Sequence, residues 1–234
     1  MATELRGDVD IAAVGALLAE PARVRILQAL DGRALPAGVL ASEAGVAPST
    51  GSGHLARLVA AGFLAVETRG RQRYYRLAEP TAADLLETMA QLAPQRPVRS
   101  LRQGNRALAL RRARSCYDHV AGRLGTDLQA TFVERGWLAG GEEEYLLTDA
   151  GRNGFLAFGI DVDALPGRRR LIRHCLDWSE RRHHLSGGLG AALLARLLAR
   201  GWVERAPTDR ALVVTPAGRA GLAREFGVEV VADP

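Results

Sequence analysis

Both cysteines of this 234-residue chain, and four of its five histidines, lie between positions 116 and 184. Thiolates and imidazoles together form a ligand set for zinc, copper(I) and softer ions, and arsenite prefers thiolates. The residues that could bind an effector or metal are Cys116, His119, His174, Cys175, Asp177 and His184.

The spacing of these residues matches no strong metal signature such as paired Cys-x-x-Cys motifs. We expect helices here, so that Cys116 and His119 share one helix face and His174 and Asp177 share another. Three interpretations stay open: coordination of a transition metal or metalloid, redox sensing by the thiols, and a purely structural role as small buried side chains. The residues identify no effector, and the default expectation is that folding requires no cofactor.

A second group of polar residues lies in the first 93 positions, which predict a series of short helices and one hairpin. Apolar residues at helical spacing predict helices that begin near Ile11, Pro21, Pro36, Pro48 and Pro80. The third and fourth helices are joined by a short turn at Gly45, as in a helix-turn-helix unit. Strands are predicted over Phe63–Thr68 and Gln72–Leu77, around a hairpin tip at Arg69–Arg71.

Three motifs in this region resemble the ArsR/SmtB family of bacterial transcriptional repressors: Ala19–Leu27, Ser52–Gly62 and Arg69–Leu77. The resemblance implies a winged helix-turn-helix and a homodimer that pairs largely through the first and last helices of the domain. It also implies binding to a pseudopalindromic operator in double-stranded DNA. Two metal sites of the family are not matched, because Arg57 and Ala61 replace the cysteines of one and residues 81–93 lack the histidine of the other.

Residue types agree with this resemblance, because side chains in the first turns of a recognition helix reach base edges. In this chain they are Ser49, Thr50, Ser52, His54 and, one turn later, Arg57. The wing contributes Arg69, Arg71 and Arg73, which we expect to contact phosphates, although solvated hairpin arginines are the alternative.

Two glycines interrupt the predicted recognition helix. Gly51 and Gly53 each cost about 1 kcal/mol in a helix interior relative to alanine. Either bulk is excluded there by DNA, or the helix start is frayed.

Beyond residue 105 the chain repeats itself, which indicates two copies of one supersecondary unit. The matching segments are Gly122–Leu128 with Gly187–Leu193, Glu134–Leu138 with Ala199–Val203, Leu147–Arg152 with Val214–Arg219, and Phe158–Val162 with Phe226–Val230. His119 and His184 occupy the same place in the two copies, so we expect them to face one another. Trp137 and Trp202 are expected to anchor packing, and Thr148 and Thr215 to cap helices.

The predicted fold class is mainly helical with small β-hairpins (α+β): a winged helix-turn-helix followed by a C-terminal domain of two degenerate winged-helix-like repeats. The predicted domains are 1–93 for DNA binding, 94–104 as a linker, 105–165 as the first repeat and 166–234 as the second. The hairpin tips of the repeats are not basic: 140–145 is acidic and 206–210 is near neutral. We therefore expect a sensing or dimer-supporting domain there, not a second DNA reader.

Composition limits the remaining function classes. All 31 basic residues are arginine, and the net charge is +5. Since this pattern is typical of GC-rich codon usage, arginine content alone is weak evidence for a nucleic-acid partner. No apolar run approaches the roughly 20 residues of a membrane helix, and no secretory signal is evident, so a reducing cytoplasm is expected.

The sequence thus predicts a cytoplasmic, homodimeric DNA-binding transcriptional regulator, an ArsR-type repressor released by an effector. No nucleophile elbow, Walker loop or dinucleotide fingerprint occurs, so no enzyme is expected, with a cysteine nucleophile and histidine base as the alternative chemistry. Two further hypotheses stay open: a metal-, metalloid- or redox-responsive sensor that uses the C-terminal cysteines and histidines, and a DNA-binding protein that needs no effector.

Overall fold

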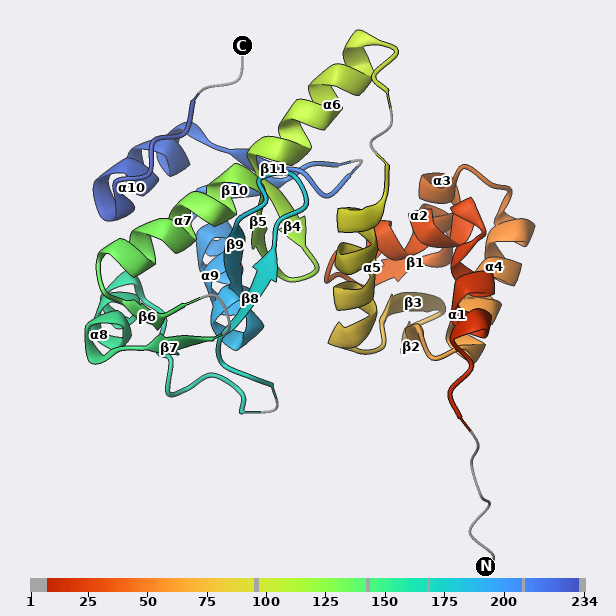
Figure 1. The fold of residues 1–234 in the computed structure, drawn as a ribbon. Helices are drawn as coiled ribbons and strands as arrows, with labels where there is room; N and C mark the ends of the chain where they lie inside the picture. Colours follow the sequence, from red (N-terminus) through yellow and green to blue (C-terminus); the bar gives the residue numbers. More distant parts are fainter. Residues whose placement is uncertain (1–7, 95–96, 142–143, 168, 208, 232–234) are drawn as a thin grey trace, which may run out of the picture. The chain divides into compact units, whose positions relative to one another are not determined.

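The computed structural model describes residues 8–94, 97–141, 144–167, 169–207 and 209–231. These residues form helices and short antiparallel hairpins, in agreement with the predicted fold class, and divide into two compact units, 1–82 and 83–234 (Figure 1). Five residues of predicted features lie outside the described ranges: Gln95 and Arg96 of the linker, Glu142 and Glu143 of the acidic tip, and Thr208 of the near-neutral tip.

Four helices open the first unit, and proline and glycine set several of their ends. They are α1 (Ile11–Leu18), α2 (Pro21–Leu30), α3 (Ala37–Ala44) and α4 (Pro48–Ala60). Pro21 and Pro48 occupy the first turns of their helices, where a missing N–H costs nothing. The buried Arg23 donates hydrogen bonds to the carbonyls of Ala16 and Leu17, so that the end of α1 is held against α2.

The helix-turn-helix is fixed by an apolar core and by one close contact between α3 and α4. Fully buried leucine and isoleucine side chains from three helices form this core: Ile26, Leu27, Leu30, Leu40, Leu55 and Leu58. A Cβ atom at Gly51 would lie 2.7 Å from the Cβ of Ala41, whereas one at Gly53 would meet open space. Gly51 is therefore needed for helix packing, and exclusion of bulk by DNA stays a prediction for Gly53. The expectation of a frayed start is wrong because α4 begins at Pro48.

The predicted wing is present as a hairpin of β2 (Leu64–Arg69) and β3 (Gln72–Leu77). Gly70 at its tip has φ +61°, a conformation that glycine adopts without steric cost. A short strand, β1 (Leu35–Pro36), pairs with the other edge of β3, which gives the sheet order β1-β3-β2. The sheet therefore ties the wing to the start of α3.

Two helices precede the repeats of the second unit. α5 (Pro80–Leu92) begins before the division between the units, and α6 (Leu101–Arg112) begins inside the range predicted as a linker. Three side-chain contacts hold α5 within the second unit: Arg173 with Asp84 and Arg210 with Glu87 as ion pairs, and Gln91 with the Leu176 carbonyl as a hydrogen bond.

The two repeats have the same order of elements, namely hairpin, helix, hairpin and helix. The first contains β4 (Arg114–Cys116), β5 (His119–Ala121), α7 (Gly122–Glu134), β6 (Leu138–Gly140), β7 (Tyr145–Leu147) and α8 (Asp149–Phe158). The second contains β8 (Arg173–Leu176), β9 (His183–Ser186), α9 (Gly187–Ala199), β10 (Val203–Arg205), β11 (Leu212–Val214) and α10 (Pro216–Phe226). The helices predicted at Cys116–His119 and His174–Asp177 are wrong, because these residues lie in and beside short paired strands. That the repeats derive from winged helices stays a prediction.

Packing inside each repeat confirms the expected roles of the tryptophans and threonines. Each tryptophan ring lies against a glycine of the following helix, and a Cβ atom at Gly154 or Gly221 would overlap the ring of Trp137 or Trp202. Thr148 and Thr215 accept hydrogen bonds from backbone N–H groups in the first turns of α8 and α10.

A buried ion pair joins the two repeats. The Arg114 guanidinium and the Asp177 carboxylate are both inaccessible to solvent and lie 2.9 Å apart. Asp177 also accepts hydrogen bonds from the backbone N–H of Gly122 and from Ser179, and Arg114 lies over the Trp178 ring. Burial acts to raise the pKa of Asp177, but Arg114 and these hydrogen bonds outweigh it and hold the pKa well below its usual range.

We predict that Gly51→Ala and Gly53→Ala have opposite effects on the first unit. Both gain helix propensity, so Gly53→Ala should stabilise the unit by about 0.5–1 kcal/mol. Gly51→Ala should instead destabilise it by about 1–3 kcal/mol, because the added methyl group collides with Ala41. Calorimetry of the full chain measures both effects, and equal shifts would contradict the packing argument.

We also predict that Asp177→Asn destabilises the second unit by about 3–5 kcal/mol, because Arg114 is left buried without a counter-charge. Asp163→Asn, which alters an exposed ion pair with Arg152, should cost about 0–1 kcal/mol. Denaturation followed by tryptophan fluorescence reports this unit, since all three tryptophans lie in it. Because the folded-state pKa of Asp177 is lowered, its stabilisation is lost as pH falls below about 4, and the difference between variant and wild type should shrink there.

Candidate DNA interface and cysteine–histidine cluster

The exposed side of α4 carries the residues that the sequence assigned to base contact. Ser49, Thr50, Ser52 and Arg57 are exposed, and His54 is half-buried. The Ser52 hydroxyl donates a hydrogen bond to the Pro48 carbonyl in the preceding turn. On the opposite side, α4 buries its leucines in the core described above. The helix therefore presents a polar surface whose orientation is set by apolar packing.

The three wing arginines are exposed but differ in their surroundings. Arg69 forms an ion pair with Glu67 and lies over the Tyr74 ring, with its guanidinium carbon 4.9 Å from the ring centroid. Glu67 also pairs with Arg76 at 2.6 Å, and the two arginines hold the pKa of Glu67 below its usual value. Within the described residues, no acidic side chain pairs with Arg71 or Arg73. These two charges are available to an anionic partner.

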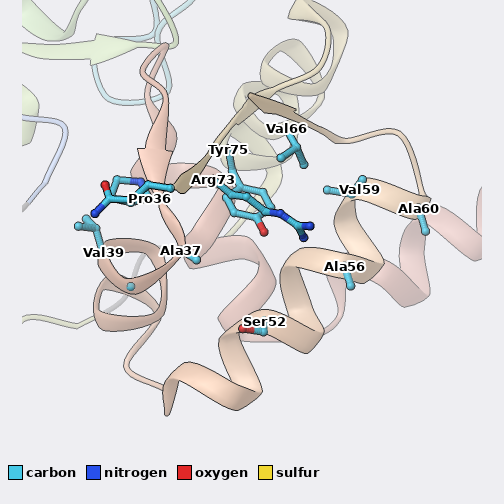
Figure 2. A pocket seen from close by; sticks show the side chains of 12 residues that line it. Pro36, Ala37, Val39, Ser52, Ala56, Val59, Ala60, Val66, Arg73 and Tyr75 are labelled. Carbon is cyan, nitrogen blue, oxygen red and sulfur yellow. The ribbon is translucent and has the colours of Figure 1, made fainter. Parts of the chain in front are cut away.

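An open groove of about 990 Å³ lies between the wing and α4. Figure 2 shows Arg73 and Tyr75 on β3 facing Ser52, Ala56 and Val59 on α4. Most lining residues are small and apolar, and Arg73 is the charged one among them. The groove thus connects the helix and the wing in one concave surface of the first unit.

The second unit brings four of the six predicted effector residues into one cluster. Cys116 pairs with His119 across the β4–β5 hairpin, and Cys175 pairs with His184 across the β8–β9 hairpin. One ligand atom from each side chain lies within 4.8 Å of the other three. The histidine rings stack with centroids 5.1 Å apart, which confirms the expectation that they face one another.

The other two predicted residues lie outside this cluster. His174 is partly exposed and stacks on His183, with ring centroids 4.4 Å apart. Asp177 is directed to Arg114, and its Oδ2 atom lies 3.6 Å from Nδ1 of His184. Asp177 therefore supports the cluster without being one of its four members.

Sequence reasoning missed Asp118, which performs the corresponding role in the first repeat. Its Oδ1 atom lies 3.4 Å from Nδ1 of His119, and it pairs with Arg169. The signal was present in the repeat: Arg114, Cys116 and Asp118 recur at the same spacing as Arg173, Cys175 and Asp177.

Proton affinities in the cluster are strongly shifted. The contact with Cys175 and then burial raise the pKa of Cys116, whereas the Cys116 thiol and the two imidazoles lower the pKa of Cys175. Burial lowers the pKa of both imidazoles, but the Asp118 carboxylate and Cys175 outweigh it at His119 and raise that pKa to about 9. The four side chains together offer two sulfur and two nitrogen atoms, which suit a soft cation once each group has lost its proton.

The chain is similar to known proteins both in its helix-turn-helix and along nearly its full length. Residues 18–67 match a family model described as a helix-turn-helix domain. Among the described residues, no helix is long and apolar enough to cross a bilayer.

Two solved structures resemble part of the chain. Rv0081 from Mycobacterium tuberculosis is 35% identical and has a TM-score of 0.33, and the match covers 35% of this chain and 82% of that one.

The second solved structure is the homodimeric winged helix-turn-helix DNA-binding domain Mb0332 from Mycobacterium bovis, described as a possible ArsR-family transcriptional regulator. It is 29% identical, with a TM-score of 0.32 and coverage of 35% of this chain and 75% of that chain. A curated relative extends along nearly the full length: the uncharacterized HTH-type transcriptional regulator YdfF from Bacillus subtilis (strain 168) is 40% identical over 223 residues, or 94% of this chain and 99% of the relative. The chain therefore belongs to the family of HTH-type transcriptional regulators.

Proposed function

We propose that the chain acts in the cytoplasm as a homodimeric ArsR-type repressor, which binds a pseudopalindromic operator and leaves it when an effector acts on the second unit. One observation carries the DNA-binding part of this proposal: the exposed polar side of α4 lies beside a hairpin whose tip carries exposed arginines. A helix of this kind fits the major groove, and the arginines fit the flanking phosphates.

Exposed apolar side chains on two helices support the dimer. α1 is an almost wholly apolar helix, yet Leu18 is its one buried residue, and Ile11 is 75% exposed. On α5, Met89 and Leu92 are exposed, the latter at 84%. Exposed apolar side chains that gather on one helix are typical of an interface. These are the helices through which the family resemblance implies pairing, and a twofold pair would place two α4 helices at successive half-sites.

Contacts of α5 within the second unit support the regulatory part. Gln91 donates a hydrogen bond to the carbonyl of Leu176, the residue that follows Cys175 in β8. Arg173 of the same strand pairs with Asp84. A change in β8 would therefore act on the helix that we assign to dimer pairing. An effector releases DNA in this way only if it binds the DNA-competent and incompetent states with different affinities.

We expect the double substitution Arg71→Ala and Arg73→Ala to weaken binding to all duplex sequences and to flatten its salt dependence. Each lost phosphate contact should reduce the slope of log K against log salt concentration by about 0.9. Arg25→Ala, on the exposed side of α2, serves as the control, and Arg69→Ala should have a smaller effect because Glu67 already balances that charge. Fluorescence anisotropy at several salt concentrations measures the slope, and an unchanged slope would remove the wing from the interface.

If α4 recognises bases, Ser52→Ala and His54→Ala should weaken binding to the operator more than binding to random duplex. Each should lower affinity for the cognate operator by about 1–3 kcal/mol, if the side chain contacts a base edge. Affinity for random duplex of the same length should change little, because that binding depends on phosphate contacts. Competition binding with both duplexes gives the two values. Equal losses on both would show that these side chains only position the protein.

A further inference from the structure

We propose that Cys116, His119, Cys175 and His184 bind one zinc ion per chain in a tetrahedral site that joins the two repeats. This site goes beyond the proposed function, because its existence does not depend on whether the first unit binds DNA.

The number of ligand atoms and the distances between them fit a tetrahedral zinc site. Two thiolates and two imidazoles form a closed tetrahedral zinc site, in which ligand atoms are separated by about 3.3–3.8 Å given the usual Zn–S and Zn–N bond lengths. The two Sγ atoms lie 4.0 Å apart, and all four ligand atoms lie within 4.8 Å of one another. Closing this set around zinc requires shifts of less than about 1 Å, which side-chain rotations supply.

Unpaired buried nitrogens provide an independent observation. Among the described residues, Nε2 of His119 and both ring nitrogens of His184 are buried and have no hydrogen-bond partner. A buried polar atom without a partner costs about 1–3 kcal/mol, so these nitrogens require an explanation. Metal coordination by both Nε2 atoms removes that cost for these two atoms. Asp118 and Asp177 lie on the Nδ1 sides of the two rings, as carboxylates do behind zinc-binding histidines.

The repeat symmetry explains how the four side chains come together. Each repeat contributes one cysteine and one histidine from opposite strands of a single hairpin. Each histidine also lies under a helix of the other repeat: a Cβ atom at Gly125 would lie 3.4 Å from the Cβ of His184, and one at Gly190 would lie 3.1 Å from the Cβ of His119. Both rings are thereby confined between backbone elements, which fixes their direction.

A disulfide fits this geometry less well. It would require the sulfur atoms to approach from 4.0 Å to about 2.05 Å. It would also leave the buried ring nitrogens of His119 and His184 without partners. Magnesium and calcium prefer oxygen ligands, and the four side chains offer none. Zinc is therefore the ion that the donor set favours.

Metal analysis of the full-length protein tests the site. We expect one zinc per chain in protein purified in reducing buffer, and the same stoichiometry when zinc is titrated into chelator-treated protein. Cobalt(II) should substitute with the intense visible bands of tetrahedral coordination and a thiolate-to-cobalt charge-transfer band. Sub-stoichiometric zinc after titration, or a weak octahedral cobalt spectrum, would overturn the proposal. So would a Cys116–Cys175 disulfide with no zinc uptake after reduction.

Variants test the assignment of ligands. Cys175→Ser and His184→Gln should lose zinc stoichiometry and the tetrahedral cobalt bands, whereas His174→Gln, next to Cys175 but outside the cluster, should keep both. If a ligand variant does not fold, as judged by tryptophan fluorescence, Cys116→His supplies a further test. It replaces one thiolate ligand with an imidazole and should bind cobalt with a weaker thiolate band. Full zinc binding by Cys175→Ser and His184→Gln, or its loss in His174→Gln, contradicts the assignment.

Operator binding, measured on the zinc-loaded and chelator-treated protein, separates this proposal from the proposed function. Stoichiometric zinc without DNA binding by either the zinc-loaded or the chelator-treated protein would support the site and contradict the proposed regulator. DNA binding without zinc uptake would do the reverse.

Discussion

Close approach between backbone elements is the constraint on which both units depend. In the first unit, Gly51 lets α4 lie against α3, and this contact decides which side of α4 faces solvent. In the second unit, Gly125 and Gly190 let α7 and α9 lie against the hairpin that precedes each helix, because a Cβ atom there would lie 2.4 Å from the Val120 carbonyl oxygen and 2.5 Å from the Leu185 carbonyl oxygen. Interiors packed to crystal-like density do not tolerate an added methylene at such places. The orientation of the proposed functional surfaces therefore depends on glycines that allow these helices to pack closely.

The first unit could be predicted closely from the sequence, because its signals are local. Prolines at the starts of α2 and α4, Gly45 after α3, and alternating residues around Gly70 each act through a few neighbouring residues. The role of Gly51 could not be predicted in this way. Gly51 packs against Ala41 of α3, and the residue pattern along α4 alone does not reveal this contact.

The cluster was predicted in composition but not in geometry. The repeat alignment placed His119 opposite His184, which is correct because a duplicated unit packs with pseudo-twofold symmetry. The helical spacing between Cys116 and His119 was misleading. β4 and β5 have three residues each, too short for an alternating pattern, and they are held by pairing with one another and by the buried Arg114–Asp177 pair. Asp118 was overlooked because its role beside His119 becomes evident only when the arginine–cysteine–aspartate spacing is compared between the two repeats.

The buried Arg114–Asp177 ion pair and the cysteine–histidine cluster both connect the β4–β5 hairpin with the β8–β9 hairpin. Asp177 joins Arg114 of one repeat to the loop that follows β8 in the other, so the hairpins are already held together without any ion. An ion bound at Cys175 would act on β8, whose neighbour Leu176 accepts the hydrogen bond from Gln91 of α5. If that strand has two positions with different contacts to α5, the cluster regulates DNA binding. If it has one, the ion only stabilises the second unit. The difference between these cases is a coupling free energy, equal whether measured as the effect of zinc on operator affinity or of operator on zinc affinity.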